Sequence, residues 1–307
     1  TKDKIDFKHS NDTTKFIFTQ TILRQVALDS LQGRAPSQIF TPVSSVPELE
    51  ALVSNWSFFE TNIHSNSYSH IIRNVYQMPK EQFDSMHDIG PIVEMAAGVG
   101  RYYDGLHNLN IRKELNIPVD EQEHINAIWM ALNASLALEC IRFLSSFAVS
   151  LAWMEQGIFM GNGNIISLIL QDELLHTEWT TYLIKQVVKD DPRFARAKVE
   201  CEAEVYRMYL EVIEEEKAWA DYLFQHGVVI GLNAEILKNF VDYTATTRLG
   251  AIGVKYLENP VKTNPLPWFQ KHVDISKKQV ALQETESGNY VIGVMSSEVE
   301  LDELPNL

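Results

Sequence analysis

The sequence predicts an all-α protein folded as a large helical bundle. Apolar residues recur at helical spacing along most of the 307-residue chain, and no segment has the two-residue period of a strand. Proline and glycine fall mainly where one apolar segment ends and the next begins. Because 45% of the residues are hydrophobic, the chain can bury a large core.

The periodic segments define the expected helices. The first covers residues 13–32 and is expected to end at Gly33. Ser45 and Pro47 form a start signal for the second, which runs to about residue 77. The remaining helices are expected at residues 80–107, 119–156, 161–189, 192–225 and 233–258. After NPVKTNPLPWF the helical periodicity ends.

The two ends of the chain differ in composition from its middle. The last stretch, ETESGNYVIGVMSSEVELDELPNL, is acidic and poor in core-forming residues, which is typical of a flexible tail. We therefore expect one helical domain over residues 1–275 and a tail over residues 276–307. The first residues are polar and do not form a signal peptide. The chain starts without Met, which suggests that an N-terminal segment is missing.

Charge and cysteine content exclude several classes of protein. The chain has 26 basic and 41 acidic residues, a net charge of −15, and no basic cluster of the kind that binds nucleic acid. Cys140 and Cys201 form neither a disulfide framework nor a zinc motif. These features predict a protein of a reducing cytoplasm, that of the host if the protein is viral.

One segment resembles a membrane span. Residues 131–154 are long and apolar enough to cross a bilayer, but Glu139 and Arg142 near their centre would be costly in lipid. We therefore predict no membrane insertion. A central helix that is apolar all round because other helices surround it explains the pattern better.

Two acid–histidine pairs lie in apolar helical segments. DELLH places Glu173 three residues before His176, and ETNIH places Glu60 four residues before His64. Both spacings put the two side chains on one helix face. A single pair of this kind is weak evidence, because short motifs of common residues occur by chance.

The segment EQEH supplies such a chance pair. Glu121 and His124 have the same spacing as Glu173 and His176, but they belong to a polar first helical turn, where acids suit the helix dipole. We expect this pair to be solvated.

Two single acids also lie in core-like segments. Asp29 occurs in VALDSLQG and Glu139 in LALECIRF, and a buried carboxylate requires a cation partner or a metal. Arginine partners are available: Arg142 for Glu139, and Arg24 or Arg34 for Asp29.

Together, the single acids and the two pairs predict a ferritin-like bundle with a di-metal carboxylate site. In such bundles two helices give one acid each and two give an acid–histidine pair. Carboxylate and imidazole ligands suit Fe(II) or Mn(II), and the absence of thiolates from the set argues against structural zinc.

The sequence resembles the small, radical-generating subunit of class I ribonucleotide reductase, especially the bacterial and phage class Ia type. The similarity covers nearly the whole chain. It is carried by IHSNSYSHIIRN, ALECIRF, the GNGNII-to-DELLH segment, EKAWADYLF, IGLN and NPLPWF. The spacings agree as well, with 31 residues from Asp29 to Glu60 and 34 from Glu139 to Glu173. The resemblance implies a ribonucleoside-diphosphate reductase, which converts ribonucleotides to deoxyribonucleotides.

The resemblance also implies roles for individual residues. Tyr68 would be oxidised to the stored radical, and Asp172 would hydrogen-bond the ligand His64. Phe143, Phe147 and Ile169 match an apolar pocket around the radical, although ordinary core packing explains each of them equally well. Two iron ions would be bound, with manganese or a mixed pair as alternatives, by Asp29, Glu60, His64, Glu139, Glu173 and His176.

Partner interactions follow from the same resemblance. The tail would dock on the large subunit, with Tyr290 relaying the radical and Glu284 as a second matching tail residue. A homodimer is implied. The family has a relay tryptophan in a segment before the point where this chain begins, and no tryptophan here precedes Trp56.

One feature departs from the family pattern. The family has two residues between the first glutamate and histidine, whereas three lie between Glu60 and His64. A π-bulge near Thr61–Asn62 would absorb the inserted residue and keep both side chains inward. Two alternatives stay open: a ferritin-like di-metal oxidase or hydroxylase, and a truncated, catalytically impaired subunit.

Overall fold

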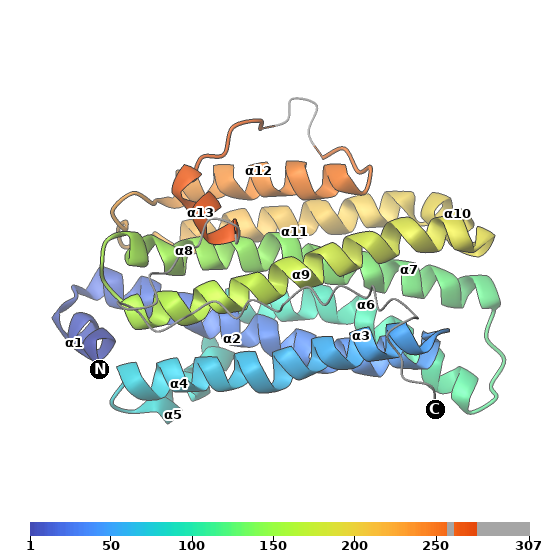
Figure 1. Ribbon diagram of the computed structural model, residues 1–307, viewed down its shortest axis with the longest axis horizontal. Helices are drawn as coiled ribbons and strands as arrows, with labels where there is room; N and C mark the ends of the chain where they lie inside the picture. The colour runs from blue at the N-terminus through green and yellow to red at the C-terminus, as the bar shows by residue number, and fades with distance from the viewer. Residues whose placement is uncertain (257–260, 275–307) are drawn as a thin grey trace, which may run out of the picture. The chain divides into compact units, whose positions relative to one another are not determined.

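The computed structural model describes residues 1–256 and 261–274. One compact unit comprises Thr1–Val273, in which long helices run side by side (Figure 1). Within the described residues, the strand-type pairing is a single isolated bridge between Val229 and Leu232. The prediction of an all-α, ferritin-like bundle is confirmed. The predicted tail, with Glu284 and Tyr290, lies outside the described residues.

The helices have the following bounds. The first half of the chain contains α1 (Lys2–His9), α2 (Asp12–Phe40), the 3₁₀ turn η1 (Thr41–Val43), α3 (Pro47–Phe58), the π-helical segment η2 (Phe59–His64), α4 (Ser65–Val75), α5 (Pro79–Ser85), the 3₁₀ turn η3 (Met86–Asp88), α6 (Gly90–Glu114) and α7 (Glu121–Ala137). The second half contains the π-helical segment η4 (Leu138–Phe143), α8 (Leu144–Glu155), α9 (Met160–Asp190), α10 (Pro192–Glu200), α11 (Glu202–Leu223), α12 (Ala234–Ala251), the 3₁₀ turn η5 (Pro267–Phe269) and α13 (Gln270–Val273).

The most apolar helix lies at the centre of the unit. α7, η4 and α8 form one rod, Glu121–Glu155, which among the described helices is the candidate membrane span by length and hydropathy. Its most apolar window is completely buried by other helices. The rod packs against α2, α6, α9 and α12, and Figure 1 shows α8 between α11 and α2. The segment is therefore a core helix, as predicted.

The prediction that the first helix ends at Gly33 is wrong. α2 continues through Gly33 and Pro36 to Phe40. Gly33 serves close packing instead: a Cβ atom there would lie 3.0 Å from Cγ2 of Thr61 in η2. The residues that follow, including Ile39, are buried in the core, and this packing outweighs the low helix propensity of glycine and proline.

Two of the predicted helices are each divided. The segment predicted at 80–107 is interrupted by η3, and α6 then continues to Glu114. The segment predicted at 192–225 breaks at Cys201. The first interruption has a sequence signal that the prediction overlooked, since Pro91 lies in the first turn of α6, where proline is favoured.

Helix α1 was not predicted, because its sequence is polar. Two of its acids, although far from α9 in the sequence, accept hydrogen bonds from backbone N–H groups at the start of α9. The Asp3 carboxylate accepts hydrogen bonds from the backbone N–H of Gly161 at 3.1 Å and of Asn162 at 2.6 Å. Asp6 accepts one from the N–H of Phe159 at 3.1 Å. These bonds satisfy donors that a helix start leaves unpaired, and Phe7 adds apolar contacts to Phe18 and Tyr76.

Candidate metal centre

The inserted residue is absorbed by a π-helical segment. η2 spans Phe59–His64 between α3 and α4, which confirms the predicted π-bulge. Its wider turn lets Glu60 and His64 both point inward, with exposed fractions of 1% and 0%, while Thr61 and Asn62 remain exposed. Glu139 lies in η4, a second π-helical segment, which was not predicted. π-Helical turns are rare and are found frequently at functional sites.

The structure brings all six predicted ligands together. They come from α2, η2, η4 and α9, and each is at most 4% exposed. They form two groups of four, within each of which the ligand atoms lie within 4.8 Å of one another. The groups are Asp29, Glu60, His64 and Glu173, and Glu60, Glu139, Glu173 and His176. Glu60 and Glu173 belong to both groups, as two shared carboxylates of a di-metal centre would.

The two imidazoles face the carboxylates through the same ring atom. Nδ1 of His64 lies 2.9 Å from Oδ1 of Asp29 and 3.2 Å from Oε2 of Glu60. Nδ1 of His176 lies 2.8 Å from Oε2 of Glu173 and 3.1 Å from Oε1 of Glu60. Glu60 therefore lies between the two rings.

Burial and the neighbouring charges shift the pKa values of the acids in the cluster. Burial raises the pKa of Asp29 and of Glu173, and the negative charge of Glu60 raises both further. Burial alone would also raise the pKa of Glu60, but hydrogen bonds from His176 and His64 hold it below its usual range. So many buried acids need added positive charge if all are to ionise together.

The donor set fits two divalent ions. Among the described residues, Oδ2 of Asp29, Oε2 of Glu139 and Oε1 of Glu173 are buried without a hydrogen-bond partner, a costly state for a carboxylate. Four carboxylates carry a charge of −4, which two divalent ions would balance while both imidazoles stay neutral. Oxygen and nitrogen donors suit iron or manganese, and the buried thiol of Cys140 belongs to neither group.

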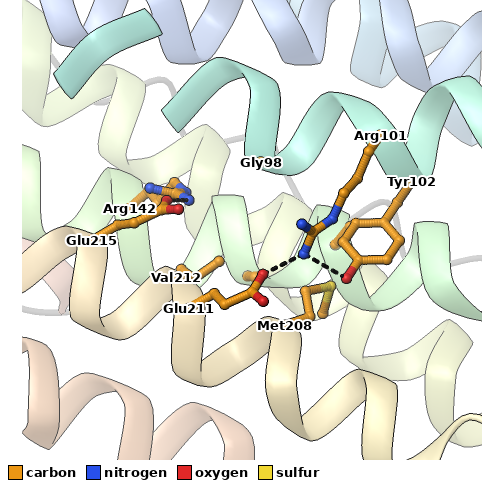
Figure 2. Close-up of a pocket in the computed structure, with 10 residues that line it drawn as sticks. Gly98, Arg101, Tyr102, Arg142, Met208, Glu211, Val212 and Glu215 are labelled. Atoms are coloured by element: carbon orange, nitrogen blue, oxygen red, sulfur yellow. Dashed lines mark hydrogen bonds and ion pairs between the residues drawn. The ribbon is translucent and has the colours of Figure 1, made fainter. Parts of the chain in front are cut away.

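The arginines at Arg24 and Arg142 bind a different acid. Both pair with Glu216 of α11, and Nη1 of Arg142 lies 3.0 Å from its Oε1. Arg142 also contacts Glu215 at 2.5 Å beside a small pocket (Figure 2). Salt bridges to these two arginines therefore do not account for the buried acids of the cluster.

Several polar residues surround the ligands. Oδ2 of Asp172 lies 3.1 Å from Nε2 of His64, on the ring side opposite the cluster. Trp56 donates from Nε1 to Oε1 of Glu60 at 3.2 Å, and Gln32 donates to Oε1 of Glu139. Trp56 and Gln32 were not predicted as site residues. Their positions, four before Glu60 and three after Asp29, are one helical turn from a ligand, and that spacing is the signal that could have identified them.

Tyr68 lies one turn after His64 and is 1% exposed. Its hydroxyl has no hydrogen-bond partner in the part of the chain that the structure describes. Burial raises the pKa of the phenol, and the charges of Asp29 and Glu173 raise it further. The site therefore places a neutral phenol in the electrostatic field of the cluster.

The three residues matched to the apolar pocket are all buried. Phe143 and Phe147 have no exposed surface, and Ile169 is almost fully buried. The rings of Phe143 and Phe147 stack with centroids 5.4 Å apart.

The prediction that Glu121 and His124 are both solvated is confirmed for Glu121 and wrong for His124. Glu121 is exposed and pairs with Lys113 at 2.9 Å. His124, however, is buried, and its Nε2 lies 2.7 Å from Oδ1 of Asn110. It faces α6 rather than solvent, which its position in a polar first turn did not reveal. Neither residue belongs to the two ligand groups.

The fold and the site define a ferritin-like helical protein with a carboxylate-shared di-metal centre. The family described as "Ribonucleotide reductase, small chain" matches residues 1–265. The chain belongs to this family.

Similar proteins come from bacteria and a phage. The chain is 37% identical to ribonucleoside-diphosphate reductase 1 subunit beta of Salmonella typhimurium, over 99% of this chain and 84% of that protein. It is 34% identical to the subunit beta of Enterobacteria phage T4, over 92% of this chain and 79% of that one. Among solved structures, the ribonucleotide reductase R2 subunit from Clostridium botulinum has a similar fold, with a TM-score of 0.76, 24% identity, and coverage of 88% of this chain and 80% of that one.

Proposed function

We propose that this chain is the radical-generating small subunit of a ribonucleoside-diphosphate reductase. The observation that carries the proposal is the pair of ligand groups sharing Glu60 and Glu173, with the buried phenol of Tyr68 one helical turn from His64. Membership of the small-chain family supports a reductase over other ferritin-like proteins. The product would be deoxyribonucleotides, made in the large subunit.

Each ligand has a place in the proposed centre. Asp29 and His64 would hold one ion, Glu139 and His176 the other, and the two shared glutamates would contact both. The donors suit Fe(II) and Mn(II), and the resemblance to class Ia subunits favours iron. Such a pair, when bound, supplies the redox equivalents for dioxygen activation and for oxidation of a nearby phenol.

The residues around Tyr68 would accept its hydroxyl proton and shape the surroundings of the radical. Because Tyr68 is neutral, its oxidation must release the hydroxyl proton as well as an electron. Oδ2 of Asp29, which lacks a hydrogen-bond partner among the described residues, is the proposed acceptor of that proton. Phe143, Phe147 and Ile169 would form an apolar wall on one side of the radical. Asp172 would fix the His64 ring so that Nδ1 faces the metals.

The large subunit is the proposed partner. Residues 1–275 would form the metal-binding domain, and residues 276–307 would dock on the large subunit, with Tyr290 as the relay and Glu284 in the docking tail. We propose a homodimer in the cytoplasm, that of the host if the protein is viral. A tail rich in acids and small residues, with a few apolar anchors, suits ordering on binding.

The test is to load the protein anaerobically with Fe(II), admit O₂ and record electron paramagnetic resonance spectra. The wild type should give a tyrosyl radical signal. Tyr68→Phe should bind the same amount of iron and give no signal. Two bound irons per chain without a radical in the wild type would contradict the proposal.

A di-metal oxidase acting on an organic substrate is the second candidate, because a pocket reaches the cluster. This Asp29 pocket has a volume of about 490 Å³ and is lined in part by Asp29, Glu60 and Tyr68. An oxidase would form an oxidised product without the large subunit and would retain that activity in Tyr68→Phe.

A further inference from the structure

The Asp29 pocket connects the metal cluster with the outside of the bundle. Its buried wall includes Asp29, Glu60 and Tyr68. Its outer wall includes the exposed residues Ser30 and Thr61. By contrast, the pocket in Figure 2 is lined by Arg142 and Glu215 and by none of the six cluster ligands.

The chemistry of this pocket suits a hydrated cation. The side chains of Ser30, Thr61, Ser65 and Ser69 place hydroxyl groups along its wall. The buried residue Asp29 also lines the pocket, and one of its carboxylate oxygens, Oδ2, has no hydrogen-bond partner in the described residues. Hydroxyl and carboxylate oxygens can replace the water ligands of a hard divalent ion one at a time.

The space is sufficient as well. About six waters surround an octahedral ion, and they would occupy roughly 180 Å³ at about 30 Å³ each. The pocket volume of about 490 Å³ exceeds this value.

The inserted residue helps to shape the pocket. Thr61 is turned outward in η2 and faces Gly33 of α2, where a Cβ would come within 3.0 Å of its methyl group. The glycine and the π-helical turn therefore form one side of the opening. On another side, Phe83 of α5 lines the pocket.

We propose that the Asp29 pocket is the route by which divalent metal ions enter the cluster. This inference rests on the proposed metal-binding function. The ion first meets the hydroxyl-lined mouth, then Asp29, and finally the shared carboxylates. Entry through the pocket limits the rate of loading, whereas the six ligands set the final amount bound.

The experiment measures Mn(II) uptake by the metal-free full-length protein after rapid mixing. The decrease of the free-ion electron paramagnetic resonance signal reports the rate, and metal analysis gives the final stoichiometry. In the variant Ser30→Leu/Ser69→Leu, two leucines fill the pocket. We expect uptake at least about tenfold slower, the effect of adding about 1.4 kcal/mol to the entry barrier, with two ions still bound at the end.

The control is Thr181→Leu, which places a leucine in a different pocket on α9 and should load at the wild-type rate. If the Ser30→Leu/Ser69→Leu variant takes up Mn(II) at the wild-type rate, the proposed route is overturned, even if two ions bind. Wild-type protein that binds fewer than two ions would instead contradict the proposed function. If the filled variant fails to fold, Phe83→Ala serves as the test, since it widens the pocket and should load faster; an unchanged or slower rate would overturn the route.

Discussion

Arg142 and Glu216 form an ion pair inside the bundle, with both side chains almost fully buried. Glu216 also pairs with Arg24 of α2 and accepts a hydrogen bond from the Ser145 hydroxyl at 2.6 Å. Arg142 lies three residues after Glu139 in η4. A single carboxylate of α11 therefore ties together two elements that supply metal ligands.

The substitution Glu216→Gln should destabilise the protein strongly. It removes the counter-charge that the two buried guanidinium groups share and leaves Arg142 only its pair with Glu215, a change that costs about 3–5 kcal/mol in free energy of unfolding. Urea titration of the metal-free protein measures it. The control Glu211→Gln breaks the half-exposed pair with Arg101 in Figure 2 and should cost under about 1 kcal/mol. Equal effects of the two substitutions would show that the buried network is unimportant.

Deleting Asn62 should preserve metal binding. The deletion restores a spacing of three between glutamate and histidine, which keeps both on one face of a regular helix. Inserting an alanine after Asn62 should instead turn His64 away from the cluster and reduce the metal content. Metal analysis of both variants after anaerobic loading provides the comparison. A deletion variant without metal would mean that the π-helical turn itself is required.

The substitution Asp172→Asn should weaken metal binding. The carboxylate holds His64 through Nε2, and loss of such an outer partner typically costs roughly 10–100-fold in affinity. Competition with a chelator of known affinity measures the change. Asp190→Asn on the same helix replaces an exposed acid bonded to Gln186 and should have no effect. The interpretation fails if Asp172→Asn also binds like the wild type.

His124 should contribute a loss of stability as the pH drops below about 6.5. Burial lowers the pKa of His124 from its usual 6.5, and the charge of Lys113 lowers it further. Between these two values the unfolded chain binds a proton that the folded protein does not, so unfolding becomes more favourable as the pH falls through this range. Below the lowered value the contribution stays constant. The variant His124→Gln should show a flatter curve of unfolding free energy against pH in this range; an unchanged slope would contradict the assignment.

Much of the site could be predicted because helical spacing fixes which side chains share a face. Glu173 and His176 needed only that rule. The π-helical turn was predicted because three residues lie between Glu60 and His64, one more than in the pattern of the resembling family. The rule assumes that sequence pattern decides each element, and it fails where packing or distant partners decide instead.

The features that were missed depend on such contacts. Gly33 does not end α2, because its lack of a side chain permits close approach to Thr61. Helix α1 has little apolar periodicity. It is bonded through Asp3 to Gly161 and Asn162, which are 158 and 159 residues further along the chain. His124 is buried against the preceding helix α6, where it contacts Asn110, 14 residues earlier in the chain. No local pattern encodes these contacts.

The sharing of Glu60 and Glu173 has a thermodynamic consequence. Whichever ion arrives first immobilises half of the donors that the second requires, so the two occupancies become cooperative. A titration would then show mostly empty and fully loaded chains, with few half-filled ones. Loss of either shared glutamate would remove a ligand from both metal sites rather than from one.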